Sequence, residues 1–434
     1  MSREEAFEIL SSPESKLKLS SDYYKAIYHL SKFPGEDTNN ALISILRSNS
    51  SQESIVIAKR KAVEVLSIHG CSKAIPLISS CLLSDDPYLQ ENAIIALERL
   101  EFKDIGFKKK LDSLLKGNNQ NRRIAIKALA SIGAKASLNN IRKIISDPSA
   151  SSIEKGAAVA AVYNLSGDST ELFRLEDNLF LANQNDRHCS VQDIIDTNLI
   201  RFLPCLLKAP ISPSFKIRAI NLLWPGEDLV IDKIDLIKTL DSIIIDNCND
   251  INVLHKYDKR PENYFLIKEL FSSDFSRCYL ALKTILLIKS SEILPSLYEK
   301  FSLIEKDYGA LYFVNKLFFI HNDWDPNVLK KIELIALNCL DSKWPDQMKF
   351  KPAAILTLMK FKPFEHKEKL IELIDDRKTF FWASRYAALI SISFNNKIFS
   401  KDFISELLDI GKNDSHRFVR LKAENIARKI LIES

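Results

Sequence analysis

Internal repetition constrains the fold of this 434-residue chain more than any other feature of its sequence. An Ala followed four residues later by Leu, often with a small residue near the end, recurs about every 31 to 34 residues. The copies are Lys59–Gly70, Leu89–Leu100, Arg122–Gly133 and Lys155–Gly167. Small residues at helical spacing lie on one stripe and allow a neighbouring helix to approach closely. The repeat therefore predicts short helical units that stack in series.

A second segment with helical apolar spacing precedes some of these copies, for example Ala74–Leu83 and Leu138–Ile145. Ser84–Pro87 and Ser146–Ser149 carry turn signals, because Asp or Ser can cap the following helix and Pro cannot continue the preceding one. The low counts of 10 Gly and 15 Pro also favour helices over turn-rich sheets. A helix pair that cannot bury its apolar face alone predicts an all-α solenoid of stacked antiparallel helix pairs.

The repeat register divides the chain into three parts. It weakens after about residue 168, and Asn183–Ser190 lacks apolar periodicity, so we expect a loop there. The later copies, with wider spacing, are Arg277–Ile288, Lys351–Phe361, Ser384–Ile392 and Val419–Ile430. We therefore expect an N-terminal array over 1–168, a less regular helical connector over 169–250 and a C-terminal array over 251–434.

The charge of the chain is nearly balanced, with 61 basic and 56 acidic side chains and a net charge of +5. Residues 101–145 depart from this balance, because eleven Lys and Arg face only three Asp and Glu. A solvated face is one interpretation of this tract, and a surface for propionates, phosphates or an acidic protein is the other. A sustained basic stripe with stacking aromatic residues is absent, so we expect no nucleic-acid partner.

The seven cysteines show neither CxxC nor paired spacing, so we expect reduced thiols, no disulfide framework and no metal site. We interpret cysteines such as Cys278 as small buried apolar residues and assign no catalytic thiol. Charges near the N-terminus and within every long apolar run argue against a signal peptide and a membrane span, which favours a soluble cytoplasmic protein. HExxH, GxSxG, Walker and GxGxxG patterns are absent, so the corresponding enzyme classes find no support.

The turn and helix pattern resembles a known repeat family. Asp-Pro in the turn, then Arg or Lys, Ala and Leu, and then Gly, resembles HEAT repeats of the phycobilisome-lyase type. With the segments Tyr257–Arg260 (YDKR), Asn322–Asp325 (NDWD) and Trp382–Tyr386 (WASRY), the chain resembles the E/F-type phycobiliprotein bilin lyases. Within these it is most similar to single-chain phycoerythrin lyases or lyase-isomerases. The run Arg385–Ala388 matches Arg-Tyr-Ala-Ala of the family's repeat helices, whereas Glu101 stands where the family has Gly.

The resemblance implies a HEAT-like α-solenoid that attaches an open-chain tetrapyrrole to a cysteine of an acidic phycobiliprotein subunit, with isomerisation of the bilin as a further option. The phycoerythrobilin-like bilin would be a substrate, and no tightly bound cofactor is expected. A bilin offers propionates, pyrrole nitrogens and a long π-system, so its site requires Arg or Lys, a carboxylate and aromatic walls. The acceptor supplies the attacking thiolate, so the enzyme needs a proton donor rather than a cysteine.

Three stretches are candidates for such a site. In the first, His255, Tyr257, Asp258 and Arg260 bring four kinds of polar group together within six residues of non-periodic sequence. Here Tyr257 would relay a proton, Asp258 would protonate or hold the pyrrole nitrogens, and Arg260 would pair with a propionate. A solvated turn between repeats is the alternative, and the sequence leaves both open.

The second stretch follows an apolar helix predicted over Ala310–Ile320. Asp323 or Asp325 would bridge pyrrole N–H groups. His321 would relay a proton while Trp324 stacks on the chromophore. The alternative is an N-cap Asp with a packed Trp.

The third stretch places Trp382, Arg385 and Tyr386 on one side of a helix, because residues three and four apart share a face. They could form a face that stacks on the bilin and pairs with a propionate. The alternative is an inter-repeat Arg ladder with aromatic core residues, as in other HEAT stacks.

Two other functions suit an all-helical solenoid. A non-catalytic scaffold would grip a helix or segment of another protein on its concave surface. A HEAT-like nucleic-acid or DNA-repair protein would bind duplex DNA with a steep salt dependence. Pigment on the purified protein or its partner after co-production with a bilin would favour a bilin lyase over both.

Overall fold

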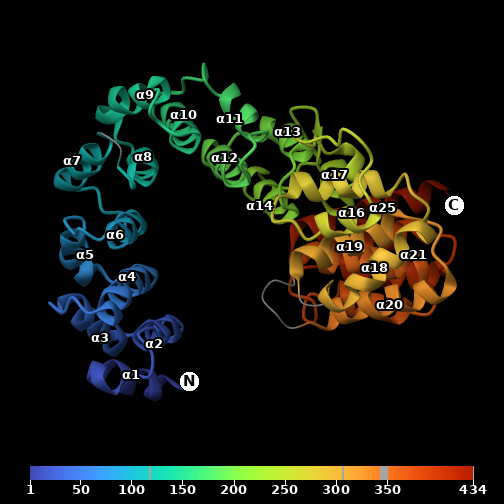
Figure 1. Cartoon of the computed structure of the whole chain (residues 1–434), viewed down its shortest axis with the longest axis horizontal. Coiled ribbons are helices and arrows are strands. Elements are labelled where there is room, and N and C mark those ends of the chain that lie inside the picture. The colour runs from blue at the N-terminus through green and yellow to red at the C-terminus, as the bar shows by residue number, and fades with distance from the viewer. Residues whose placement is uncertain (117–118, 305–306, 343–349, 434) are drawn as a thin grey trace. The chain divides into compact units, whose positions relative to one another are not determined.

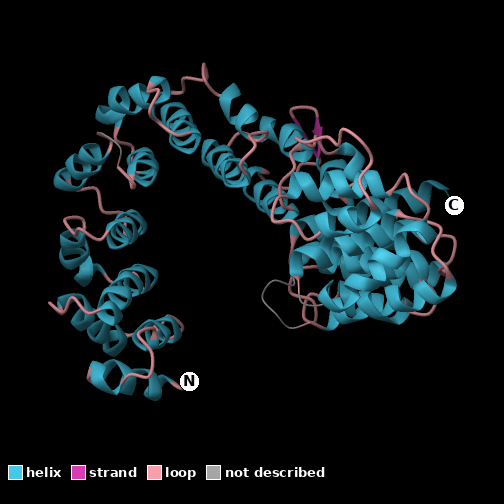
Figure 2. Cartoon of the chain, in the orientation of Figure 1, coloured by secondary structure: helices cyan, strands magenta, loops and turns pink. Residues whose placement is uncertain are grey.

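The computed structural model describes residues 1–116, 119–304, 307–342 and 350–433. Regular structure in these ranges is helical except for one two-stranded hairpin (Figures 1 and 2). Across the same ranges, no helix combines the length and the apolar character that crossing a membrane requires. The prediction of an all-α solenoid of paired helices is confirmed.

The chain forms two compact units, Met1–Arg174 (unit 1) and Leu175–Ser434 (unit 2). The division falls within helix α11 (Phe173–Asn178). The sequence-based division at 168 and 250 follows repeat regularity rather than compactness, and its bounds stay a prediction.

Unit 1 is a stack of helix pairs in two layers. The first helices of the pairs are α1 (Arg3–Ser11), α3 (Glu36–Arg47), α5 (Ile75–Cys81), α7 (Ile105–Leu114) and α9 (Leu138–Ser146). The second helices are α2 (Asp22–Leu30), α4 (Glu53–Ile68), α6 (Pro87–Arg99), α8 (Arg122–Ser131) and α10 (Ser152–Ser166), and each packs on the next. Short 3-10 turns are η1 (Glu14–Lys16), η2 (Ser72–Ala74) and η3 (Lys135–Ser137). All four N-terminal repeat copies read from the sequence lie on second helices.

Polar residues in the turns start and stop the helices of unit 1. Asp86 accepts a hydrogen bond from a backbone N–H of α6 at 3.0 Å, and Pro87 is the first residue of that helix. Ser151 and Glu154 form a capping box at the start of α10, which satisfies backbone N–H groups that lack a partner inside the helix. Gly167 ends α10 at φ 75°, a left-handed conformation that a side chain would strain.

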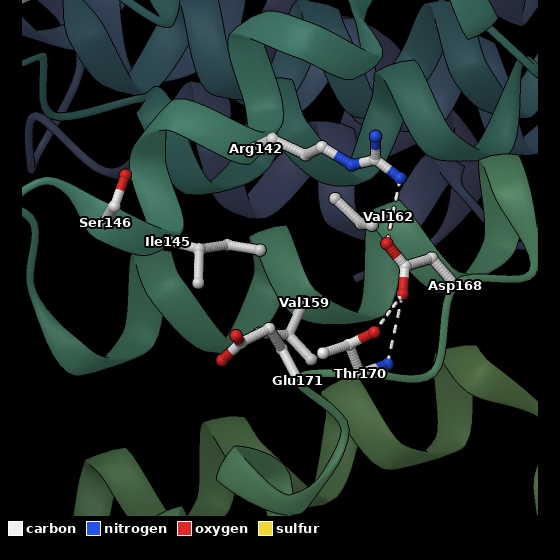
Figure 3. Close-up of a pocket in the computed structure, with 8 residues that line it drawn as sticks. All are labelled: Arg142, Ile145, Ser146, Val159, Val162, Asp168, Thr170 and Glu171. Carbon is white, nitrogen blue, oxygen red and sulfur yellow. Dashed lines mark hydrogen bonds and ion pairs between the residues drawn. The ribbon is translucent and has the colours of Figure 1, made fainter.

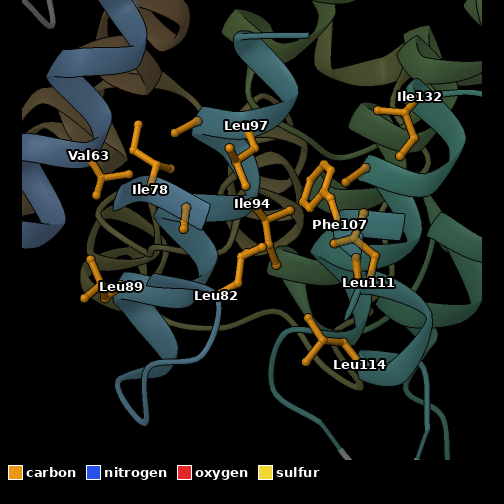
Figure 4. Packing of buried hydrophobic residues seen from close by; sticks show 14 of the residues in the cluster. Val63, Ile78, Leu82, Leu89, Ile94, Leu97, Phe107, Leu111, Leu114 and Ile132 are labelled. Carbon is orange, nitrogen blue, oxygen red and sulfur yellow. The ribbon is translucent and has the colours of Figure 1, made fainter. Parts of the chain in front are cut away.

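The stripe of small residues lies in the core of unit 1, as predicted. Ala62, Ala93 and Ala125 are fully buried, and so are the Leu residues four positions later. Figure 4 shows Ile94 and Leu97 of α6 among apolar side chains of the neighbouring helices. Burying one such side chain contributes about 1.5 to 3 kcal/mol, so the continuous core, rather than helix propensity, holds the short helices together.

Unit 2 begins with single helices and continues as a second stack. Its first helices are α12 (Gln184–Thr197), α13 (Leu203–Lys208), α14 (Pro213–Leu223) and α15 (Leu236–Ile245), with 3-10 turns η4 (Ile200–Phe202) and η5 (Cys248–Asp250). The hairpin of β1 (Val230–Ile231) and β2 (Ile234–Asp235) precedes α15, and its turn residues Asp232 and Lys233 have positive φ.

The stack of unit 2 consists of helix pairs. The first helix of each pair is α16 (Asn263–Glu269), α18 (Ser290–Ile304), α20 (Pro326–Asp341), α22 (Lys367–Ile374) or α24 (Lys401–Lys412). The second helices are α17 (Phe275–Ile285), α19 (Tyr308–Ile320), α21 (Lys351–Phe361), α23 (Trp382–Phe394) and α25 (Arg417–Glu433).

The prediction of a loop over Asn183–Ser190 is wrong. Asn183 caps α12, and the first turns of that helix occupy the stretch. Apolar periodicity is missing because Arg187 is fully buried. Its guanidinium donates to the two carbonyls before the cap and to the carboxylate of Asp274. A buried arginine thus occupies a core position that pattern reading assigns to an apolar residue.

Helix α15 lies against the second helices of the unit 2 stack. Asp241 of α15 accepts hydrogen bonds from the hydroxyl of Tyr386 on α23 at 2.9 Å and from the ammonium of Lys422 on α25 at 2.7 Å. Burial raises the pKa of Tyr386 well above its usual value, so the phenol remains a donor. A helix of the same chain therefore fills the side of the stack that a simple solenoid leaves open.

A buried polar cluster surrounds the C-terminus of α15. Asp246 accepts hydrogen bonds from the hydroxyls of Tyr279 on α17 and Tyr312 on α19, both at 2.5 Å. The ammonium of Lys216 on α14 lies 3.4 Å from the same carboxylate. Lys316 on α19 donates to the last two carbonyls of α15, and burial lowers the pKa of Lys316 to about 8. Each buried charge thus has a carboxylate or helix-terminal carbonyls to offset its desolvation.

Arginines of second helices pair with acids at the start of the next second helix. Arg60 of α4 contacts Asp86, the cap of α6, at 2.7 Å. Arg122 of α8 contacts Asp147, in the turn before α10, at 3.3 Å. This ladder ties successive pairs together through polar contacts that cross the turns.

Candidate functional site

The third predicted stretch lies in the packing between repeats. Arg385 of α23 is 2% exposed, and its guanidinium donates to both carboxylate oxygens of Asp414 at 2.6 and 2.8 Å and to two carbonyls before the helix. Tyr386 is fully buried, and Trp382 stacks on the ring of His416 at 4.6 Å between centroids. These contacts form the arginine ladder with core aromatics that the sequence left open as the alternative. A propionate could bind Arg385 only by displacing Asp414.

The second predicted stretch forms the turn between α19 and α20. Asp325 caps α20 by accepting a backbone N–H at 2.8 Å, and Trp324 donates its indole N–H to a carbonyl of α19 at 3.2 Å. A capping Asp and a packed Trp, the structural alternative, describe these two residues. His321 is buried with Nε2 2.8 Å from the carbonyl of Ile288, whereas the side chain of Asp323 is 55% exposed.

The first predicted stretch lies between η5 and α16. Asp258 and Arg260 are exposed there, and Tyr257 is partly buried. The hydroxyl of Tyr257 is buried and has no hydrogen-bond partner among the residues that the structure describes. Burial, together with the charge of Glu269, raises the pKa of Tyr257 to about 12. The phenol therefore keeps its proton near neutral pH and can act as a donor.

Two of the three stretches contact the first turn of α18, at different residues. Ser290 donates two hydrogen bonds to Asp323. Its backbone N–H donates to the carboxylate at 3.3 Å, and its hydroxyl donates to the backbone carbonyl. Arg260 lies 3.5 Å from the carboxylate of Glu292. We name Arg260, Ser290, Glu292, His321 and Asp323 the α18 site. The third stretch packs instead against α15 and α25.

The α18 site combines exposed charges with a buried imidazole. About half of the side-chain surface of Arg260, Glu292 and Asp323 is exposed, whereas His321 is 9% exposed. Nδ1 of His321 lies 2.5 Å from the carboxylate of Asp323 without the alignment of a hydrogen bond. An imidazole that aligns with a neighbouring carboxylate can pass a proton to it, and a guanidinium can bind a ligand carboxylate. The site therefore offers a cation for a propionate, carboxylates for pyrrole N–H groups and a proton carrier.

Sequence reasoning missed a face of unit 1 that brings rings and a cation together. Tyr24 and Tyr28 on α2 are 38% and 56% exposed, and the ammonium of Lys61 on α4 lies 5.6 and 5.0 Å from their ring centroids. Both carboxylate oxygens of Glu64 hold that ammonium at 2.8 Å. The four-residue spacing of the tyrosines was the available signal, because such residues share one face of a helix. Exposed rings beside a fixed cation suit a flat conjugated ligand.

A small hollow lies within unit 1, between α9, α10 and the segment after α10 (Figure 3). Ile145, Val159 and Val162 form its apolar side, and Arg142 pairs with Asp168 at 2.9 Å beside them. The other lining residues are Ser146, Thr170 and Glu171. Its volume of about 270 Å³ lies below the range of roughly 300 to 1,000 Å³ typical of small-molecule sites, so it suits one side chain or ring rather than a whole tetrapyrrole.

Three buried or partly buried cysteines of unit 2 lack the features of a nucleophile. Burial raises the pKa of Cys205 to about 11 and that of Cys248 to about 12, and it also raises the pKa of Cys278. A thiol with a raised pKa carries little thiolate near neutral pH. These residues therefore serve packing rather than covalent chemistry.

No protein-family model matches the chain. It is 36% identical over 407 residues to the bilin biosynthesis protein CpeY of Synechococcus sp. (strain WH8020), covering 93% of this chain and 96% of that protein. It is 28% identical over 396 residues to the uncharacterized phycocyanin operon protein Y of Pseudanabaena tenuis (strain PCC 7409), covering 90% and 91%. The structure of the complex of CpcE and CpcF of phycocyanin lyase from Nostoc sp. PCC7120 aligns with a TM-score of 0.46 and 23% identity, over 56% of this chain and 94% of that chain. Because the identity to CpeY extends over nearly the full length of both proteins, this chain belongs to the E/F-type bilin lyase family.

Proposed function

We propose that this protein is a bilin lyase that attaches a linear tetrapyrrole to a cysteine of a phycobiliprotein subunit. The observation that carries the proposal is the 36% identity to a bilin biosynthesis protein along 93% of the chain. A phycoerythrin-type acceptor, a phycoerythrobilin-like substrate and isomerisation of the bilin during transfer are the finer parts of the same proposal.

The reaction adds a thiol across a carbon–carbon double bond of the bilin. The acceptor thiolate forms a carbon–sulfur bond, the π-bond breaks, and the adjacent carbon takes up a proton equivalent to the one that the thiol lost. Atoms and electrons balance without an oxidant or a reductant. The enzyme therefore has to bind the pigment, hold its nitrogens and deliver one proton in the right place.

The α18 site supports these tasks. In this proposal Arg260 pairs with a propionate, while Asp323 and Asp258 hold pyrrole N–H groups. His321 passes a proton to or from Asp323, and Tyr257 is the other candidate donor. Trp324 and Asp325 shape the turn that carries Asp323, so they act as positioning residues.

The buried stretch on α23 has a different part in the proposal. Arg385, Tyr386 and Trp382 are engaged in contacts with Asp414, Asp241 and the ring of His416. They set the spacing of α23, α15 and α25 rather than touch the pigment. Their substitution should therefore change stability before it changes transfer.

Co-production with a bilin and separate phycobiliprotein subunits tests the proposal. We expect one subunit to acquire covalent pigment, seen as absorbance that persists after denaturation, only when this protein is present. Double substitution of Arg260→Gln and Asp323→Asn should reduce the yield of pigmented subunit while the protein remains folded. Pigment attachment that is equal with and without this protein, for every subunit tried, would reject the lyase assignment and leave a scaffold.

A further inference from the structure

The basic tract of unit 1 forms a distinct surface in the folded protein. Most of its lysines lie on α7, on α9 and in the turns beside these helices, whereas Lys127 lies on α8. We use the name basic face for seven of these lysines, namely Lys103, Lys108, Lys109, Lys110, Lys116, Lys135 and Lys143. The sequence left two interpretations of this tract open, a solvated face and a binding surface.

The positive charges of the basic face are not compensated by acidic side chains in the described part of the chain. Across the described residues, none of its seven lysines forms an ion pair. Some lysines on unit 2 pair with nearby acids, such as Lys362 with Glu365 at 2.9 Å and Lys412 with Asp409 at 3.1 Å, whereas others, such as Lys397 and Lys401, form no ion pair among the described residues. Uncompensated charges of one sign repel each other, so the basic face carries a cost that a bound acidic surface would offset.

The lysines of two neighbouring helices contribute to one side of the stack. Lys109 on α7, Lys116 just after α7 and Lys143 on α9 are exposed. Asn140 of α9 donates to Asp112 of α7 at 3.5 Å, which places the two helices beside each other. The exposed lysines of the two helices therefore lie in one layer of the stack, with the carboxylate of Asp112 at the contact between the helices.

We propose that the basic face docks an acidic protein surface, namely that of the subunit which receives the bilin; the identity of this partner rests on the proposed function. The chemistry of the face favours a protein over nucleic acid. Ile105 at the start of α7 is 69% exposed, and residues 101–145, where described, show no exposed aromatic ring on which bases could stack. An exposed aliphatic residue among cations matches the composition of a protein interface with a charged rim.

Charge reversal on the full-length protein tests the docking proposal. The triple variant Lys109→Glu, Lys116→Glu and Lys143→Glu reverses the charge at three exposed positions of the basic face. The matched control, Lys238→Glu, Lys397→Glu and Lys401→Glu, lowers the net charge equally at exposed positions of unit 2. Both variants should melt at the temperature of the wild-type protein, because exposed substitutions of this kind rarely change stability by more than about 0.5 kcal/mol.

Binding is measured against purified apo-subunits of phycobiliproteins and against poly-L-glutamate over a salt series. We expect the face variant to bind the acceptor at least about tenfold more weakly at low salt, with a shallower salt dependence, and the control to match the wild type. In the transfer assay the face variant should raise KM for the acceptor and leave kcat unchanged. Equal binding by the face variant and the control would overturn the docking proposal.

The outcomes separate docking from catalysis. If the wild type transfers bilin and the face variant does so with the same KM, docking at the basic face is wrong and the lyase assignment stands. If no subunit receives pigment, yet the face variant alone loses binding to an apo-subunit and to poly-L-glutamate, the docking surface stands and the lyase assignment fails. Tighter binding to duplex DNA or to phosphatidylglycerol vesicles than to any apo-subunit, abolished only in the face variant, would assign the face to another anion and overturn the proposal.

Discussion

The guanidinium of Arg385 and the carboxylate of Asp414 form two parallel hydrogen bonds in the interior of unit 2, at 2.6 and 2.8 Å. Both side chains are almost fully buried, at 3% and 1% exposure. The pair joins α23 to the residues just before α25, so it fixes the spacing of two second helices. Arg385, a candidate propionate ligand in the sequence, connects two neighbouring repeats in the folded protein.

Breaking this pair should destabilise unit 2. Arg385→Ala leaves the carboxylate of Asp414 buried and uncompensated, and loss of one partner of a buried pair typically costs about 3 to 5 kcal/mol. The free energy of unfolding in urea measures the change. Arg377→Ala is the control, because Arg377 makes the same two-bond contact with Asp375 but its side chain is 85% exposed. We expect the control to lose less than about 1 kcal/mol; equal losses in the two variants would contradict the structural role of Arg385.

The cluster around Asp246 should behave as a coupled network. Asp246→Asn keeps the side-chain shape and tolerates the left-handed backbone at φ 44°, but it removes the charge that compensates Lys216. We expect a loss of about 2 to 4 kcal/mol, and a smaller loss when Lys216→Met is combined with it. A double-mutant cycle measures the coupling between the two positions. Strictly additive losses would show that the two charges do not interact.

Acid should weaken the fold through two stacked histidines. Burial lowers the pKa of His188, stacked on Phe215, and that of His416, stacked on Trp382, to about 4. In the unfolded chain a histidine titrates near 6.5, so between pH 6.5 and 4 the unfolded state binds more protons than the folded state. The stabilising contribution is therefore complete above pH 6.5 and is lost as the pH falls toward 4.

The size of this effect is at most about 1.4 kcal/mol per pH unit for each histidine, and less because both rings are partly exposed. Urea unfolding at pH 7.5, 6, 5 and 4.5 measures it. The variant His188→Asn, His416→Asn should show a flatter dependence on pH over this window than the wild type. An unchanged slope would exclude the two histidines as its source.

The α18 site should affect transfer more than stability. Arg260→Gln removes a charge from a side chain that is 54% exposed, so we expect the free energy of unfolding to change by less than about 0.5 kcal/mol. Loss of a charged contact to a propionate should lower kcat/KM for bilin transfer by roughly tenfold, with partial recovery in Arg260→Lys.

Arg428→Gln is the matched control for this prediction. Its side chain is 65% exposed and forms a comparable pair with Glu424 on α25. It should leave transfer unchanged. If Arg260→Gln transfers bilin as well as this control does, Arg260 does not contact the pigment.

Repeat periodicity predicted the helix pairs well because a solenoid is built from local contacts. Ala62, Ala93 and Ala125 recur at nearly constant spacing, since each repeats the same approach to the preceding pair. Prediction failed at α12, where buried Arg187 replaces an apolar residue, because its partner Asp274 is distant in sequence. The candidate stretches show the same limit. An N-cap such as Asp325 is visible locally, whereas the acid that binds Arg385 is not.

The sequence by itself determined that this chain forms stacked helical pairs and that it resembles the E/F-type bilin lyases, because both conclusions depend on the order of residue types along the chain. Only the tertiary structure decided which polar side chains remain available for a ligand. Arg260 and Asp323, separated by more than sixty residues, each contact the first turn of α18 and stay exposed, while Arg385 and Tyr386 are buried against acids from other parts of the chain. Burial and partner choice depend on long-range packing, and the desolvation of a charge is settled only when that packing is complete.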